Sequence, residues 1–257
     1  MNISRDFYHS RQGVAIGCPD SSNNVLKKEG RALLMERIAI FLGGMIAMVS
    51  SWMASAAGGE LEQQLRRAAE RGDVVQLQAA LAAGAQIEAR DAAGATPLLI
   101  ATHANQIAAA KALIEAGADV NAKDRIDDSP YLYAGARGLN EILRLTLAHG
   151  ADLKSTNRYG GTALIPAAER GHVETVRTLI EAGVAPDHVN RLGWTALLEA
   201  IILGDGGPSH EAIVAALLAA GADPELADGQ GITPLQHARQ RGYAGMARQL
   251  EQAGARR

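Results

Sequence analysis

The stretch DAAGATPLLIATHANQIAAAKALIEAGADVNAK, residues Asp91 to Lys123, carries the signals that decide the fold. Thr96 can accept a hydrogen bond from a free N–H group at a helix start, and Pro97 fits the first helical position. After Asn105, apolar residues recur at helical spacing as far as Gly117. The stretch therefore predicts a turn, a short helix, a tight turn and a longer helix that a glycine ends.

The same signals recur along the chain in one register. The glycines at the predicted helix ends are equally spaced, except for one longer interval before the fifth, and they are Gly84, Gly117, Gly150, Gly183, Gly221 and Gly254. A second series precedes five of these glycines by a constant interval and consists of Gly72, Asn105, Gly138, Gly171 and Gly242. The third series, of helix-start residues, is Thr96, Ser129, Thr162, Thr195 and Thr233. Three series in one register predict a repeat architecture.

One such helix pair cannot bury its apolar face alone, whereas stacked neighbours can, so the sequence predicts a solenoid. Aromatic residues make up only 4% of the chain, and alanine and leucine dominate the repeats. This composition is typical of short, closely packed helices rather than of one large core.

The repeats resemble the ankyrin repeat, whose pattern includes G-x-T-P-L, a glycine in the middle and G-A-D-V-N-A at the end. The resemblance extends from near Gly58 to the end of the chain and implies an all-α ankyrin-repeat solenoid of stacked helix-turn-helix units with β-hairpin-like turns. The repeat domain is expected over 58–257, in six units near 58–90, 91–123, 124–156, 157–189, 190–227 and 228–257.

The sequence also departs from the family pattern. The histidine that normally follows T-P-L is replaced in every unit, by Leu99, Leu132, Ile165, Leu198 and Gln236, so we expect less rigidly braced hairpins. Asp127 and Asp128 replace the turn glycine of the third unit, where aspartate is a suitable turn residue. An insertion, Gly204 to Pro208, is expected between the two helices of the fifth unit and accounts for the longer interval.

No catalytic, phosphate-binding or dinucleotide-binding motif is present, and the histidines lack metal-ligand spacing. The net charge of −3 argues against nucleic acid as the main partner. The only cysteine is Cys18, so the repeats have no disulfides or thiol chemistry. We therefore expect a protein that is not an enzyme and that has no cofactor or metal.

The resemblance implies binding to another protein through the hairpin tips and the concave face. Arginine, tyrosine and tryptophan, the types enriched among binding hot spots, gather in the third to fifth units. The candidate contact residues are Arg125, Ile126, Asp128, Arg158, Tyr159, Glu169, Arg170, Arg191, Leu192 and Trp194. The chain is expected to be a monomer. A module for a small molecule or glycan, and an ankyrin scaffold fixed to a membrane, remain as alternatives.

A different signal precedes the repeats. Met35 to Glu60 contains Arg37, an uncharged run from Ile38 to Gly59 and a small-residue site ending at Ala56. These are the parts of a secretory signal peptide, so residues 35–56 are expected to be removed by cleavage after Ala56. Residues 1–34 then form an irregular extension or a misassigned start. The expected location is periplasmic or secreted. The alternative is an uncleaved anchor that holds the array on the inner membrane, facing the periplasm.

Overall fold

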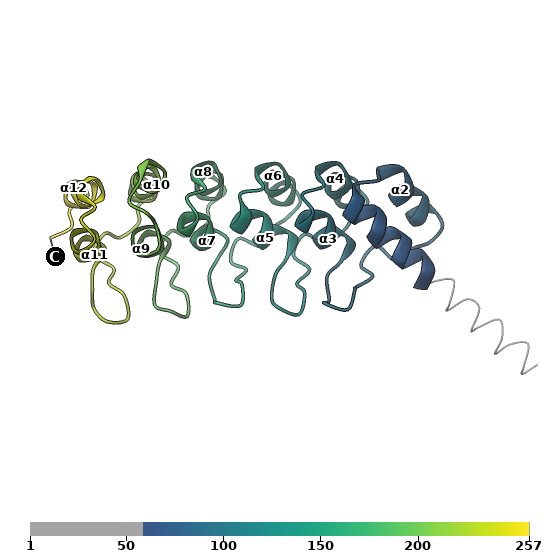
Figure 1. Ribbon diagram of the computed structural model, residues 1–257, viewed down its shortest axis with the longest axis horizontal. Coiled ribbons are helices and arrows are strands. Elements are labelled where there is room, and N and C mark those ends of the chain that lie inside the picture. Colours follow the sequence, from purple (N-terminus) through teal and green to yellow (C-terminus); the bar gives the residue numbers. More distant parts are fainter. Residues whose placement is uncertain (1–58, 257) are drawn as a thin grey trace, which may run out of the picture. The chain divides into compact units, whose positions relative to one another are not determined.

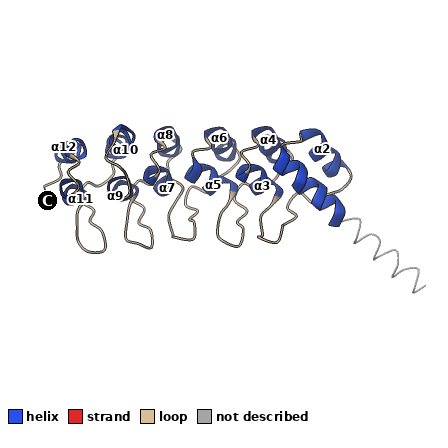
Figure 2. Ribbon diagram, in the orientation of Figure 1, coloured by secondary structure: helices blue, strands red, loops and turns tan. Residues whose placement is uncertain are grey.

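The computed structural model describes residues 59–256, which form a row of stacked helix pairs (Figure 1). Residues 59–71 are helical, and the described segment contains no strand (Figure 2). The expected all-α repeat solenoid is confirmed. The helices that follow are α2 (Val74–Ala82), α3 (Pro97–His103), α4 (Ile107–Glu115), α5 (Pro130–Arg137), α6 (Asn140–Ala148), α7 (Leu164–Glu169), α8 (Val173–Glu181), α9 (Ala196–Ile202), α10 (Pro208–Ala219), α11 (Pro234–Gln240) and α12 (Ala244–Gln252).

The helices form two layers, because each packs on its counterpart in the neighbouring unit. The first helices of successive units, α3, α5, α7, α9 and α11, contact one another in order, and so do the second helices, α4, α6, α8, α10 and α12. Long hairpin loops extend from the layer of first helices (Figure 1). The hairpins and the first helices therefore share one side of the stack.

Threonine or serine side chains start most of the first helices, as the motif predicts. The hydroxyl of Thr96 accepts a hydrogen bond from the N–H of Leu99 at 3.2 Å, and Ser129, Thr195 and Thr233 do the same in their units. Thr162 differs. The N–H of Ile165 binds the backbone carbonyl of Thr162 at 3.2 Å instead. That bond takes the donor that a capping hydroxyl would use, and the buried Thr162 hydroxyl has no partner in the described residues.

The tight turns need backbone in the left-handed region. Asn105 has φ 51° where other units have glycine, and Asp127 has φ 62° in place of the hairpin glycine. Asparagine and aspartate can replace glycine at these turns because they tolerate positive φ better than other side chains do.

Leucine and alanine dominate the core, and each fully buried leucine contributes roughly 2 kcal/mol. Small residues let neighbouring units approach closely. A Cβ at Gly135 would lie 2.8 Å from the Cβ of Ala163, so α5 could not meet the start of α7 with a larger side chain there. At the C-terminal end, α12 exposes Arg248, Glu251 and Gln252, the polar surface that a terminal unit requires.

The hairpins are braced by their first residue, although the family histidine is missing. Asn157 Oδ1 accepts hydrogen bonds from the N–H groups of Tyr159 at 2.9 Å and Gly161 at 3.1 Å. The equivalent acceptors of the other hairpins are Asp91, Asp124, Asn190 and Asp228. In the last unit Gln236 replaces the histidine and its side chain accepts from the N–H of Thr233. These bonds brace the hairpins in the absence of the family histidine.

The insertion follows α9, as predicted, but its last residue, Pro208, begins α10, so the insertion also lengthens that helix. It is tied to both neighbouring units. His210 bridges Asp205 Oδ1 at 2.8 Å and the carbonyl of Glu169 at 2.9 Å, while the Tyr243 hydroxyl donates to the carbonyl of Gly204 at 3.1 Å. The extra residues therefore form a fixed link between units four, five and six.

The signal peptide, its cleavage at Ala56 and the extension over 1–34 lie outside the described residues. The repeats form a compact unit, Ala57–Arg257. Among helices within 59–256, none is long and apolar enough to cross a bilayer.

Candidate functional site

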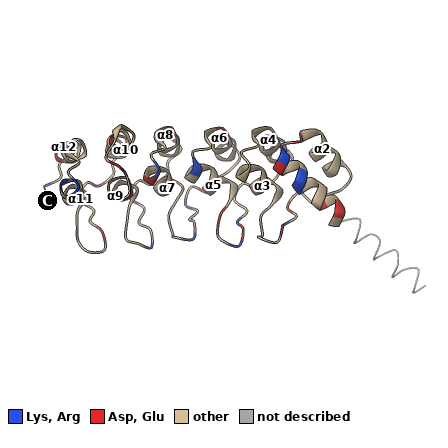
Figure 3. Cartoon of the chain, viewed as in Figure 1, with Lys and Arg blue, Asp and Glu red and all other residues tan. Residues whose placement is uncertain are grey.

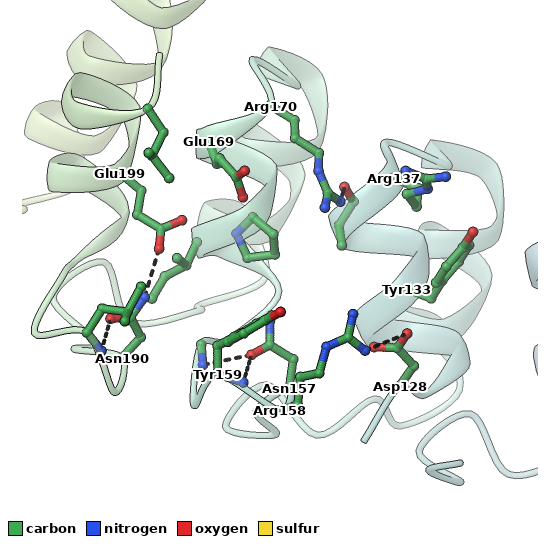
Figure 4. Close-up of a pocket in the computed structure, with 16 residues that line it drawn as sticks. Asp128, Tyr133, Arg137, Asn157, Arg158, Tyr159, Glu169, Arg170, Asn190 and Glu199 are labelled. Carbon is green, nitrogen blue, oxygen red and sulfur yellow. Dashed lines mark hydrogen bonds and ion pairs between the residues drawn. The ribbon is translucent and has the colours of Figure 1, made fainter. Parts of the chain in front are cut away.

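A groove of about 490 Å³ crosses the third, fourth and fifth units, between the hairpins and the first helices α5, α7 and α9 (Figure 4). We call it the concave groove. It is partly open to solvent, and its lining mixes charged, aromatic and aliphatic residues. The lining residues are Asp128, Tyr133, Ala136, Arg137, Asn157, Arg158, Tyr159, Gly161, Ile165, Pro166, Glu169, Arg170, Asn190, Leu192, Glu199 and Leu203.

The structure brings most of the sequence-predicted contact residues together here. The predicted residues in the lining are Asp128, Arg158, Tyr159, Glu169, Arg170 and Leu192. Arg125, Ile126, Arg191 and Trp194 belong to the same hairpins but do not line the concave groove. Their role in binding stays a prediction.

Three arginines form one half of the concave groove, and the units that they come from are adjacent (Figure 4). The Arg158 guanidinium lies 5.3 Å from the ring centre of Tyr159, and its Nη1 lies 3.7 Å from Asp128 Oδ2. The Arg137 guanidinium lies 5.6 Å from the ring centre of Tyr133. These distances are those of cation–π contacts, which favour a position of each guanidinium group over its ring.

The remaining arginine and Asp128 are held by their surroundings. Arg170 Nη1 donates to the backbone carbonyl of Ala136 in the preceding unit, which fixes this side chain across the unit boundary. Burial raises the pKa of the Asp128 carboxyl, and the nearby charge of Arg158 opposes that rise. The basic half of the concave groove is therefore ordered before any partner arrives.

Two glutamates form the other half. Glu199 on α9 is only 5% exposed, and its Oε1 accepts a hydrogen bond from Asn190 Nδ2 at 2.8 Å. Burial raises the pKa of Glu199 to about 7, and the charge of Glu169 adds to the rise, while the Asn190 hydrogen bond and Arg170 oppose it. The side chain thus changes its charge near neutral pH.

The hairpin tips add an exposed row beside the concave groove. Ile126, Tyr159 and Leu192 occupy the same register position in three successive units and are 51%, 56% and 56% exposed. The arginine before each of them places basic side chains at the tips (Figure 3). Adjacent hairpins are joined through their backbones, because the N–H of Arg191 donates to the carbonyl of Tyr159 at 2.9 Å.

Sequence reasoning missed Glu199, Asn190 and Tyr133 as groove residues. A signal for Glu199 exists, since it is the only charged residue in ALLEAII, the sequence of α9. Asn190 has a signal in the register, because the second to sixth units all begin with aspartate or asparagine, whereas Tyr133 has no comparable signal. Within residues 59–256, no three histidine, cysteine or acidic side chains are grouped to hold a metal ion.

The stacked helix pairs and the concave groove define a helical repeat protein that presents an exposed binding surface. The sequence profile described as ankyrin repeats (3 copies) matches residues 131–228, and that of the single ankyrin repeat matches 93–125. The chain belongs to the ankyrin-repeat family. Members of this family are typically protein–protein interaction modules and are generally non-catalytic.

Solved structures of other ankyrin-repeat proteins have the same fold as this chain. An ankyrin repeat domain from Acinetobacter baumannii is 66% identical, with a TM-score of 0.73 over 75% of this chain and 98% of that chain. A second ankyrin repeat protein is 44% identical, with a TM-score of 0.72 over 74% of this chain and 98% of that chain. The ankyrin repeat domain of Bcl-3, of the IκB protein family, is 26% identical, with a TM-score of 0.68 over 75% of this chain and 86% of that chain.

Among curated proteins, the ankyrin repeat protein YahD of Escherichia coli is 53% identical over 57 residues. That match spans 22% of this chain and 28% of the length of YahD.

Proposed function

We propose that this chain is an exported ankyrin-repeat protein that binds a segment of another protein in the concave groove. The observation that carries the proposal is the set of exposed aromatic, aliphatic and arginine side chains that three adjacent units place around one groove. Such residue types dominate the energetics of protein interfaces. The fold braces them through hairpin and inter-unit hydrogen bonds, so little ordering entropy is lost on binding.

The shape of the site favours a polypeptide over a small molecule or glycan. Sites for small ligands bury most of the ligand surface in a concave, mainly apolar pocket. The concave groove is partly open and continues into the exposed row at the hairpin tips. An extended segment could follow both surfaces, whereas a small ligand would leave most of its surface in water.

Export is proposed from the sequence of residues 35–56 alone. Cleavage after Ala56 would leave the compact unit Ala57–Arg257 whole, which supports a removable leader. N-terminal sequencing of the protein from the periplasmic and culture fractions tests this proposal. A mature terminus at Ala57 supports it, while a protein that retains residues 35–56 in the membrane fraction favours the anchored scaffold.

Capture of the partner tests the binding site. We would express variants with Tyr159→Ala and Leu192→Ala, and use Val75→Ala as the control because Val75 is 78% exposed on α2, outside the concave groove. The proposal expects both groove variants to lose a partner that wild type and the Val75→Ala variant capture. Equal capture by all four proteins would contradict it.

A further inference from the structure

We propose that the bound segment is acidic, with a carboxylate side chain seated among Arg137, Arg158 and Arg170 and an adjacent apolar side chain on Leu192 and Leu203. This inference rests on the proposed function and specifies the chemistry of the partner. The proposed occupant of the concave groove is an extended peptide segment.

The three guanidinium groups have N–H donors that are available for a ligand. Each guanidinium carries five N–H donors. Within the described residues, the only acidic group in ion-pair range of the three is Asp128, which lies 3.7 Å from Arg158. That separation is too long for a direct hydrogen bond. Arg170 uses one nitrogen on the carbonyl of Ala136 and keeps the others. A carboxylate could therefore gain charge-assisted hydrogen bonds without displacing a strong internal partner.

The arginines are also ordered before binding. Arg137 is held over Tyr133 and Arg158 over Tyr159, while Arg170 is held by the preceding unit. Because these contacts already restrict the three side chains, less side-chain entropy is lost when a carboxylate binds. Long exposed arginines without such contacts would bind an anion less effectively.

The charge balance favours an acidic occupant over a basic one. Glu199, one of the two glutamates of the opposite half, is buried and bonded to Asn190. The raised pKa of Glu199, about 7, means that a substantial fraction of this group is neutral at neutral pH. Asp128 already faces Arg158. Asp128, Glu169 and a partly ionised Glu199 together carry less negative charge than the three arginines carry positive charge. A lysine-rich segment would therefore meet net repulsion in the basic half.

The proposed contact with an apolar side chain of the partner follows from the exposure of two leucines. Leu192 and Leu203 are 56% and 50% exposed, and both line the concave groove. Burying such side chains against an apolar residue of the partner is favourable, at roughly 25 cal/mol per Å². An anion without an apolar neighbour, such as a nucleic-acid backbone, would leave these leucines uncovered. The pairing of acidic and apolar residues is thus what distinguishes a peptide from other polyanions.

Short labelled peptides test the inference with the full chain. One peptide alternates leucine with aspartate and glutamate, a second replaces the acids with asparagine and glutamine, and a third replaces them with lysine. An oligothymidine of similar length is the fourth probe. We expect the acidic peptide to bind at least about tenfold more tightly than each of the others, as measured by fluorescence anisotropy. We also expect the affinity to fall as salt is raised.

Variants assign the effect to the arginines. Arg137→Ala and Arg158→Ala should each weaken binding of the acidic peptide about tenfold, with Arg158→Lys in between. Arg177→Ala is the control, because Arg177 is exposed on α8 and does not line the concave groove. The inference is overturned if the acidic peptide binds no better than the neutral one, if no peptide binds, if oligothymidine binds equally well, or if Arg177→Ala has the same effect.

The two proposals can fail separately. If capture of the natural partner depends on Tyr159 and Leu192 while the acidic peptide has no advantage, the acidic chemistry is wrong and the proposed function stands. If capture does not depend on those residues, the proposed function itself is wrong.

Discussion

Replacement of Glu199 by glutamine should make the protein more stable at alkaline pH and leave its stability almost unchanged at acid pH. The Glu199 side chain is 5% exposed and accepts a hydrogen bond from Asn190 at 2.8 Å. A glutamine carbonyl can accept the same bond, so Glu199→Gln mainly removes the cost of burying a charge.

The magnitude follows from the pKa of Glu199, which burial and Glu169 raise from 4.5 to about 7. Well below pH 4.5 the carboxyl is protonated in both folded and unfolded states, so it does not change the free energy of unfolding. As the pH rises towards 7, the unfolded chain releases the proton and the folded chain keeps it, so the free energy of unfolding decreases. The full difference between the two pKa values of Glu199 would lower the free energy of unfolding by about 3 kcal/mol. Solvent in the partly open groove screens the charge, so we expect about 2 kcal/mol.

Urea denaturation of wild type and Glu199→Gln at a series of pH values measures the effect. The difference in unfolding free energy should be small near pH 4.5, increase through about pH 6 and level off above about pH 7, with the variant more stable by about 2 kcal/mol. Histidine titrations are common to both proteins and cancel in the difference. Glu181→Gln, at an exposed position on α8, is the control. A difference that does not change with pH would show that Glu199 does not titrate differently in the folded and unfolded chains.

Three further predictions concern stability, each measured by urea denaturation. Tyr131→Phe should be neutral or stabilising by up to about 1 kcal/mol, because the buried Tyr131 hydroxyl has no partner in the described residues; a clear loss would reveal one. Gly206→Ala should cost at least about 2 kcal/mol, because φ is 71° and the new Cβ would lie 2.4 Å from the Tyr243 ring. Gly254→Ala should cost only about 1 kcal/mol, because φ is 102° but no atom lies near the new Cβ. Equal losses of stability in the two variants would contradict the role of the Tyr243 contact. Asn157→Ala should cost about 2 kcal/mol, since the N–H groups of Tyr159 and Gly161 lose their acceptor, and Asn157→Asp, which keeps it, should cost less; the reverse order would contradict the proposed bracing.

The fold could be predicted from the sequence because its signals are local and repeated. Helix starts, tight turns and helix ends recur once in every unit, and even the substitutions Asn105 and Asp127 obey the same backbone rule. The position of the insertion also follows from the register. Thr162 is the exception, because its carbonyl competes with its hydroxyl for one N–H, and no residue pattern reveals that competition.

The candidate site could be predicted in part. Register places the tips of successive units side by side, so Arg158, Tyr159 and Leu192 could be identified from position and residue type. Glu199 could not be identified from the repeat pattern, because this acidic residue does not recur at the same position in other units. Its place in the site depends on its hydrogen bond with Asn190, at the start of the same unit. Trp194 was selected by residue type, but it is half-buried at the base of its hairpin, where its N–H and carbonyl bond to Asn190.

Site-specific crosslinking can show directly whether a partner protein binds in the concave groove. A photo-reactive phenylalanine analogue would replace Tyr159 in one variant and Val75 in another, since both side chains are more than half exposed. The protein would be irradiated in the fraction where it resides, and crosslinked partners would be identified by mass spectrometry. We expect a specific partner to be crosslinked at Tyr159 but not at Val75. Crosslinking of that partner at Val75 and not at Tyr159 would contradict it.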